Sequence, residues 1–161
     1  MGIAQDLLQQ ADHLASYEGA NPSQASLRRA VSTAYYALFH LLIEDAALRW
    51  NGSSEARTGM ERAFQHGPMK NTSLQFGQQT WKDWHGNKKA IPLAIQEIAG
   101  AFVDLQDERH AADYDNHEQW TATDVEGILK IAKLAFQHWA SIRTDPMAGN
   151  YLLAMLLTKQ R

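Results

Sequence analysis

The stretch RRAVSTAYYALFHLLIEDAA, residues 28–47, decides the fold class of this 161-residue chain. Apolar side chains recur through it at the helical spacing, which places them on one face of an α-helix. The members of this stripe are Leu27, Val31, Ala34, Leu38, Leu41 and Leu42. A long helix with such a stripe predicts a helical core against which further helices pack.

A second line of side chains on the same expected helix is polar. It follows the same spacing on a neighbouring face and consists of Arg29, Thr33, Tyr36, His40 and Glu44. A guanidinium, a hydroxyl, a phenol, an imidazole and a carboxylate thereby share one helix edge. This edge is either a solvated face or one wall of a binding site, and the helix by itself does not decide between the two.

Similar periodicity elsewhere predicts an all-α fold, an up-and-down four-helix bundle with additional short helices. The other long helices are expected at residues 3–17, at residues 92–112 and after a capping box at Thr123–Glu126. Short helices are expected at residues 55–65, at residues 68–76 and after Asp145 and Pro146. One domain over residues 1–161 is the expected organisation.

Two further segments stand out from this helical pattern. Residues 77–89, GQQTWKDWHGNKK, show no clear period and are expected to form a surface loop. Short basic clusters occur at Arg28–Arg29, at Lys82 with Lys88–Lys89, and at Lys159 with Arg161. Charge runs this short are expected to be solvated faces.

Composition and motif content exclude several classes of function. The chain has no cysteine, which removes disulfides and thiolate chemistry, and its formal net charge of -3 argues against a broadly basic surface for long nucleic acid. No HExxH pair, nucleophile-elbow serine or glycine-rich phosphate loop occurs, so no metal and no cofactor are expected. The expected setting is cytoplasmic, because the absence of cysteine is compatible with a reducing compartment. The N-terminal sequence lacks the signal-peptide pattern and no apolar run is long enough to span a membrane, so a soluble protein is expected.

The segment DLQDERHAADYDNH, residues 104–117, holds a second group of unusual polar residues. The apolar stripe of the preceding helix continues from Leu105 to Arg109, so Arg109 is expected to face inward or along the core boundary. Asp113 follows four residues later, where an arginine and a carboxylate can pair. The pair is either an internal tie or part of a polar notch shared with Tyr36 and His40, in which Arg109 binds phosphate.

Three segments together resemble the HEPN superfamily, the helical domains named for higher eukaryotes and prokaryotes nucleotide-binding. They are SLRRAVSTAYYALFHLL at residues 26–42, RAFQHGPMK at residues 62–70 and FVDLQDERHAADYD at residues 102–115. The resemblance implies a four-helix bundle, often a homodimer with a polar cleft between helices. Such domains occur in prokaryotic toxin–antitoxin, defence and RNA-processing systems.

Many HEPN domains are metal-independent endoribonucleases, and the resemblance makes Arg109, His110 and His117 the expected catalytic residues. In the family's motif a histidine follows the arginine by a few residues. Here His110 follows at once and His117 follows with seven residues intervening, so neither has the family's spacing. The residues expected to bind the nucleotide or RNA are Arg29, Tyr36, His40, Asp113 and Tyr114.

The leading hypothesis is therefore a cytoplasmic, homodimeric HEPN-type domain that binds a nucleotide or RNA phosphate. The rival is a non-catalytic protein interaction module, in which residues 77–89 and the YLLAMLL helix bind a partner, or an accessory subunit of a nucleotidyltransferase. The resemblance implies a nucleotidyltransferase antitoxin as the partner and Tyr114 as the residue it would modify. A folded remnant that keeps the family's core without its chemistry is the third alternative.

Overall fold

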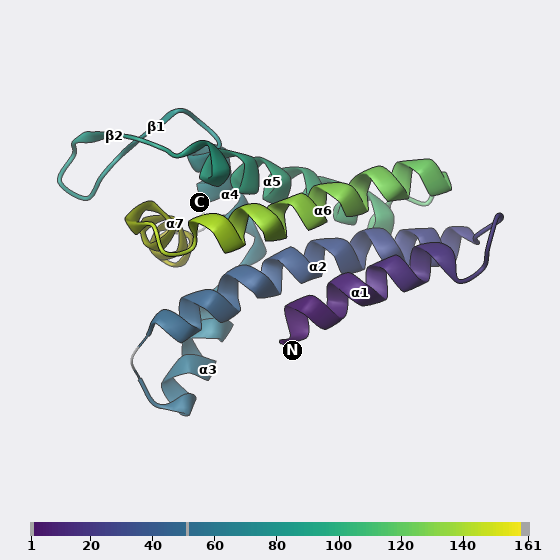
Figure 1. The fold of residues 1–161 in the computed structure, drawn as a ribbon, viewed down its shortest axis with the longest axis horizontal. Helices are drawn as coiled ribbons and strands as arrows, with labels where there is room; N and C mark the ends of the chain where they lie inside the picture. The colour runs from purple at the N-terminus through teal and green to yellow at the C-terminus, as the bar shows by residue number, and fades with distance from the viewer. Residues whose placement is uncertain (1, 51, 159–161) are drawn as a thin grey trace. The chain divides into compact units, whose positions relative to one another are not determined.

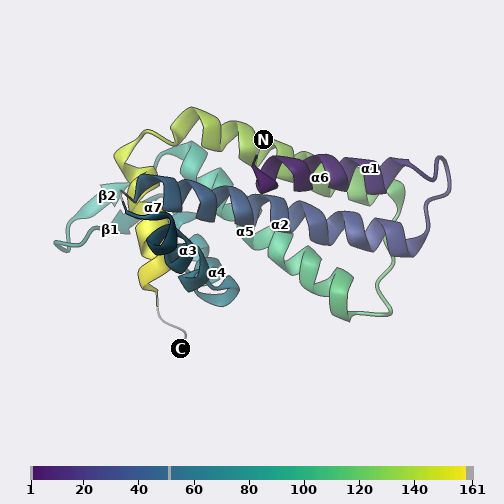
Figure 2. The ribbon, with the colours of Figure 1, turned by 90° about the horizontal axis from the view of Figure 1, so that it is seen from below.

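The computed structural model describes residues 2–50 and 52–158 and is mostly helical. Seven helices and one two-stranded sheet make up this part of the chain (Figures 1 and 2). The all-α prediction is confirmed. Among the described residues, no helix combines the length and the apolar character needed to cross a membrane.

The helices follow the expected order along the chain. They are α1 (Ile3–Ser16), α2 (Gln24–Arg49), α3 (Ser54–Ala63), α4 (His66–Phe76), α5 (Leu93–Tyr114), α6 (Ala122–Ile142) and α7 (Pro146–Leu157). The longest is α2, with 26 residues, and it contains the whole stretch on which the fold class was predicted. Asp145 caps α7 by accepting a hydrogen bond from the backbone N–H of Met147, as the Asp-Pro sequence predicts.

The capping box predicted for the start of α6 was wrong. The reciprocal capping pair is Thr121 and Asp124, in place of Thr123 and Glu126. The backbone N–H of Thr121 donates to Oδ2 of Asp124 at 2.8 Å, and that of Asp124 donates to Oγ1 of Thr121 at 3.1 Å. The hydrogen bond from the Thr121 backbone is the main reason that the pKa of Asp124 is lowered.

The prediction of an irregular loop at residues 77–89 was also wrong, because the segment forms a β-hairpin. Strands β1 (Thr80–Lys82) and β2 (Lys88–Ala90) pair antiparallel. Oδ1 of Asp83 accepts the backbone N–H groups of His85 and Asn87, and Gly86 takes a positive φ of 84° in the turn. This turn chemistry favours a hairpin.

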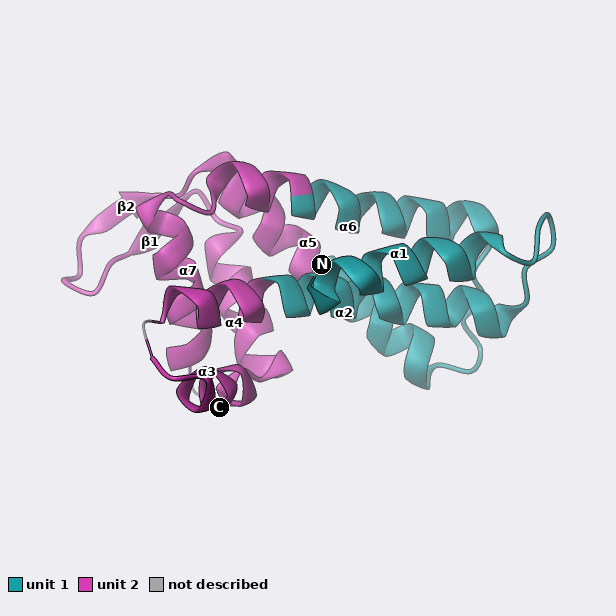
Figure 3. Ribbon diagram, turned by 60° about the horizontal axis from the view of Figure 1, so that its bottom comes forward, with its two compact units in different colours: residues 1–41, 104–136 teal, residues 42–103, 137–161 magenta. Residues whose placement is uncertain are grey.

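The chain divides into two compact units, and Figure 3 shows the residues of each unit in its own colour. Unit 1 consists of residues 1–41 and 104–136, and unit 2 of residues 42–103 and 137–161. Helices α2, α5 and α6 contribute residues to both units, where the sequence predicted one domain over residues 1–161. Each unit buries apolar side chains of its own, such as Val31, Leu38, Leu105 and Ala132 in unit 1 and Ile95, Phe102, Trp139 and Tyr151 in unit 2.

Candidate functional site

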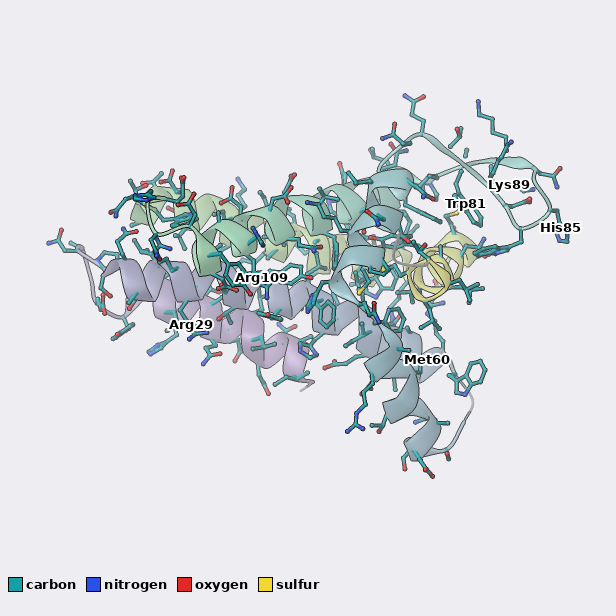
Figure 4. The ribbon with its side chains drawn as sticks, turned by 180° about the vertical axis from the view of Figure 1, so that it is seen from behind. Arg29, Met60, Trp81, His85, Lys89 and Arg109 are labelled. Carbon is teal, nitrogen blue, oxygen red and sulfur yellow. The ribbon has the colours of Figure 1, made fainter. Side chains whose placement is uncertain are left out.

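Arg109 is the centre of a polar network in unit 1. Its Nη2 donates a hydrogen bond of 2.7 Å to the phenol oxygen of Tyr36, and its Nε lies 2.9 Å from Oδ2 of Asp113. Figure 4 marks Arg109 on α5, the helix that faces Tyr36 of α2 through this bond. The Arg109 side chain is 15% exposed, which confirms the predicted position at the core boundary and the pairing with Asp113.

Three tyrosine rings surround the Arg109 guanidinium. Its central carbon lies 5.8 Å from the ring centroid of Tyr35, 5.3 Å from that of Tyr36 and 5.8 Å from that of Tyr114. These distances are within the range of cation–π attraction. The arginine thus has an aromatic environment as well as a carboxylate partner.

The network keeps Arg109 charged although the side chain is largely buried. Burial alone would lower the pKa of Arg109, but the hydrogen bond to Tyr36 and the charge of Asp113 outweigh it, so the pKa is raised. Burial also raises the pKa of the neighbouring Tyr35. The resulting site holds a permanent cation beside the neutral phenol of Tyr35.

Asp113 extends the network to a second residue of α2. Its Oδ1 accepts a hydrogen bond from the hydroxyl of Ser32, while its Oδ2 faces Arg109. Ser32 and Tyr36 are four residues apart on α2, and Arg109 and Asp113 are four apart on α5, so both pairs follow one helix face. Ser32 was not predicted as a site residue, although it is a small polar residue one helical turn before Tyr36 in a largely apolar stretch.

A polar depression lies over the last turn of α5 and the loop that follows it, and we refer to it as the α5-end depression. Its lining consists of Asp107, His110, Ala111, Tyr114, Asp115, Asn116 and His117. Both histidines that the sequence nominated therefore border one surface. Tyr114 connects this surface to the network, because its ring lies 5.0 Å from the His110 ring and 5.8 Å from the Arg109 guanidinium carbon.

Two other nominated residues lie outside these contacts. Arg29 is exposed on α2, and Figure 4 marks it on that helix. The ring of His40 packs edge-on against Phe39 at a centroid distance of 5.5 Å. The polar contacts of Arg109 are thus with Tyr36 and Asp113, and Tyr36 is the residue of the predicted polar edge of α2 that takes part in them.

Arg28 holds the backbone that shapes the α5-end depression. Its Nη1 donates to the carbonyl oxygens of Ala112 at 3.0 Å and Asp115 at 2.9 Å, and its Nη2 donates to that of Glu118. The Arg28 guanidinium also lies 5.1 Å from the Trp120 ring centroid. Arg28 therefore has a structural role, because its guanidinium donates hydrogen bonds to backbone carbonyls at and after the C-terminal end of α5.

The electrostatic setting of the depression is acidic. Residues 104–118 carry six carboxylates, namely Asp104, Asp107, Glu108, Asp113, Asp115 and Glu118. The pKa of Asp115 is lowered, mainly by a hydrogen bond from the backbone N–H of His117 and further by the charge of Arg28. An anion at this site would have to be held by a few direct contacts, since the surrounding charge repels it.

The hairpin in unit 2 is a second candidate surface, with the opposite charge. Lys82 and Lys88 are direct cross-strand partners, an arrangement of like charges that destabilises a sheet. Trp84 is 52% exposed in the turn and packs edge-on against Trp81 at 5.2 Å. Figure 4 shows His85 at the tip and Lys89 on the second strand.

The carboxylate within this hairpin is already engaged. Asp83 accepts two backbone N–H groups of the turn, and its Oδ2 lies 3.9 Å from Nζ of Lys89. Burial works against the ionised form of Asp83, but these hydrogen bonds and Lys89 outweigh it and lower the pKa. The surface thus combines an exposed aromatic ring with an excess of positive charge.

Within residues 2–50 and 52–158, no three His, Cys, Asp or Glu side chains are grouped so that they could hold a metal ion. No protein-family model, curated protein or solved structure matches the chain.

Proposed function

We propose that this chain is an HEPN-type domain, with an up-and-down four-helix core, that binds a nucleotide or short single-stranded RNA at the α5-end depression. The observation that carries the proposal is that His110, Tyr114 and His117 line one depression, and that the Tyr114 ring also lies near the Arg109 guanidinium. Imidazoles and a phenol supply acid–base groups and a stacking surface without a metal. The dimeric state and the nucleotidyltransferase antitoxin that the resemblance implies belong to the same proposal.

Cleavage of RNA at this site would need one proton acceptor and one proton donor. One histidine would take the proton of the ribose 2′-hydroxyl as its oxygen attacks phosphorus. The other would give a proton to the 5′-oxygen as the P–O5′ bond breaks, leaving a cyclic phosphate and a free 5′-hydroxyl. His110 and His117 are the pair that the depression offers for these roles.

Arg109 has a positioning role in this proposal. Its Nε and Nη2 already face Asp113 and Tyr36, so these two nitrogens are committed inside the domain. The guanidinium instead fixes the Tyr114 ring, whose other neighbour is His110. Loss of Arg109 is therefore expected to disturb the depression indirectly.

The proposal is tested by RNA binding and cleavage with the full chain in the presence of EDTA. The His110→Ala/His117→Ala double variant is expected to bind a short fluorescein-labelled single-stranded RNA more weakly. Any cleavage is expected to fall at least about a hundredfold, the contribution typical of a lost general acid or base. His13→Ala, an exposed histidine on α1, is the matched control. Equal RNA affinity in the double variant and the control would reject the α5-end depression as the site.

The hairpin supports the same class of ligand independently. An exposed tryptophan next to unneutralised lysines is typical of surfaces that bind single-stranded nucleic acid by stacking and phosphate contact. Trp84→Ala and Lys82→Ser are expected to weaken RNA binding, and Lys82→Ser is also expected to reduce its salt dependence. Unchanged RNA affinity in both variants would remove the hairpin from the proposal. The α5-end depression would still be tested by the His110→Ala/His117→Ala variant.

A further inference from the structure

A separate pocket of about 140 Å³ lies in unit 2, among the end of α2, helix α3 and helix α7, and we refer to it as the α3–α7 pocket. Its lining consists of Ala46, Arg49, Trp50, Met60, Phe64, Gly149, Leu152, Leu153 and Leu156. Figure 4 marks Met60 on α3. A cavity of about this volume holds one benzene ring in other proteins, so a single ring or a short alkyl chain would fit.

Apolar side chains at this pocket are left in contact with water. Trp50 is 53% exposed and Leu153 is 43% exposed, although both line the pocket. Covering apolar surface contributes roughly 25 cal/mol per Å² to binding. An apolar group that enters the pocket would therefore gain from contact with these side chains.

The charge next to the pocket is unbalanced toward the positive. Asp45, whose side chain is 5% exposed, accepts a hydrogen bond from Nε of Arg49 at 3.1 Å and another from Nη2 of Arg143. Two guanidiniums thus share one carboxylate, and Arg49 belongs to the lining. Nη2 of Arg49 also donates a hydrogen bond to the backbone carbonyl of Arg143, so Nη1, which faces Gly149, is the nitrogen open to a ligand. One added negative charge would balance this cluster, and a carboxylate can accept a charge-assisted hydrogen bond from Nη1.

Gly149 of α7 leaves the space in front of Arg49 open. A Cβ atom at residue 149 would lie 3.6 Å from Nη1 of Arg49, which is ordinary contact. Because Gly149 lines the pocket, a larger side chain at this position is expected to occupy part of it. Glycine inside a helix costs about 1 kcal/mol relative to alanine, so this helix gives up stability where the pocket is open.

We propose that the α3–α7 pocket binds a small monocarboxylate that carries an aromatic ring or a short alkyl group. The apolar group lies against Phe64 and Leu152, and the carboxylate lies beside the Arg49 guanidinium. This ligand class follows from the volume, the apolar lining and the single excess positive charge. The site is independent of the nucleotide or RNA site proposed for unit 1.

Phenylacetate is the probe, and phenylacetamide is its neutral match. Both are titrated into the full chain labelled with ¹³C at the methionine methyl groups. The methyl signal of Met60 is expected to shift saturably, while those of the buried Met69 and Met155, which are outside the lining, serve as internal references. The amide is expected to bind about tenfold more weakly, the equivalent of one charge-assisted contact.

Four variants separate the parts of the proposal. Gly149→Leu fills the pocket and is expected to abolish the shift, whereas Gly149→Ala is expected to keep binding within about threefold because its Cβ makes only ordinary contact. Arg49→Gln is expected to bind phenylacetate and phenylacetamide equally. Leu153→Trp enlarges another lining side chain, keeps the Met60 methyl group as the reporter, and replaces Gly149→Leu if the latter lowers the folded fraction.

The proposal is overturned if phenylacetate produces no saturable Met60 shift, or if both filling variants bind it as the unmodified chain does. Equal affinity for the acid and the amide in the unmodified chain would reject the carboxylate. A dimer seen by sedimentation that Gly149→Leu dissociates would assign the pocket to a second copy of the chain instead. RNA binding is measured on the same variants and is expected to be unchanged, so failure at one site is distinguishable from failure at the other.

Discussion

The phenol oxygen of Tyr36 accepts a 2.7 Å hydrogen bond from Nη2 of Arg109, which joins the middle of α2 to the last turns of α5. One turn away on both helices, Ser32 donates to Asp113. Arg109 and Asp113 also pair with each other, so four side chains form one connected network. Such networks stabilise a fold when all members are satisfied and cost stability when one is removed.

Removal of the Tyr36 hydroxyl is expected to destabilise unit 1. In Tyr36→Phe the mostly buried guanidinium loses the acceptor of its Nη2 group and keeps Asp113, and a hydrogen bond to a charged group is worth about 1.5–3 kcal/mol. Urea unfolding followed by circular dichroism measures the loss. Tyr114→Phe is the control, because Tyr114 is 64% exposed, and its expected change is below about 0.5 kcal/mol. Equal stabilities of the two variants would contradict the role assigned to Tyr36.

Replacement of Arg28 tests how the loop after α5 is held. Lysine keeps the charge in Arg28→Lys, but its single ammonium cannot reproduce the planar fork that serves the carbonyls of Ala112, Asp115 and Glu118. The expected loss is about 1–2 kcal/mol, and amide hydrogens of residues 115–120 are expected to exchange faster. Arg29→Lys, at the adjacent exposed position, should leave both unchanged. Unaltered exchange in Arg28→Lys would show that other contacts hold the loop.

Side-chain periodicity is sufficient to predict the helices and the inward position of Arg109. Arg109 follows Leu105 by four residues, so it lies on the same face of the helix as the apolar stripe. This spacing correctly predicted the inward position of the guanidinium. Helical spacing no longer predicts positions beyond Tyr114, because α5 ends there. His117 was therefore not placed by its spacing from Arg109, and its position depends on the loop that Arg28 holds through backbone carbonyls.

The hairpin and the cap of α6 were mispredicted for different reasons. Strands of three residues are too short to show alternation, and only Asp83, Gly86 and Asn87 carried a signal for the turn. At α6, both Thr121 and Thr123 precede an acidic residue by three positions. The structure uses Thr121, which follows the buried Trp120, and burial of this kind is not visible in local sequence.

Glu18 is expected to make the turn between α1 and α2 sensitive to acid. Its carboxylate accepts the backbone N–H of Ser23 and the hydroxyls of Tyr17 and Ser26, and the first of these contributes most to lowering its pKa to about 2. A lowered pKa means that the ionised form stabilises the fold above the usual value of 4.5, and that this contribution disappears as the pH falls from about 4.5 to about 2.

Glu18→Gln is therefore expected to be less stable than the unmodified chain at neutral pH, with a difference that narrows below pH 4.5 and vanishes near pH 2. Thermal unfolding over this pH range measures the difference. Glu126→Gln, exposed on α6, controls for the change in net charge. A difference that stays constant down to the lowest pH would mean that the contacts of Glu18 do not depend on its ionisation.

Replacement of Asp45 is expected to destabilise unit 2, because one nearly buried carboxylate serves both Arg49 and Arg143. Asp45→Asn keeps the shape but leaves two guanidiniums facing a neutral amide. Removing one partner from a fully buried ion pair costs about 3–5 kcal/mol. Here the arginine side chains are 35% and 50% exposed and can be hydrated, so a loss of about 2 kcal/mol is expected.

Arg143→Gln is the matched comparison, since it leaves Asp45 paired with Arg49. Half of the Arg143 side chain is in solvent, so its removal is expected to cost less than about 1 kcal/mol. Urea unfolding of both variants at low and high salt gives the two losses. If Arg143→Gln is as destabilising as Asp45→Asn, the two arginines do not share the carboxylate. The excess positive charge inferred beside the α3–α7 pocket would then lose its basis.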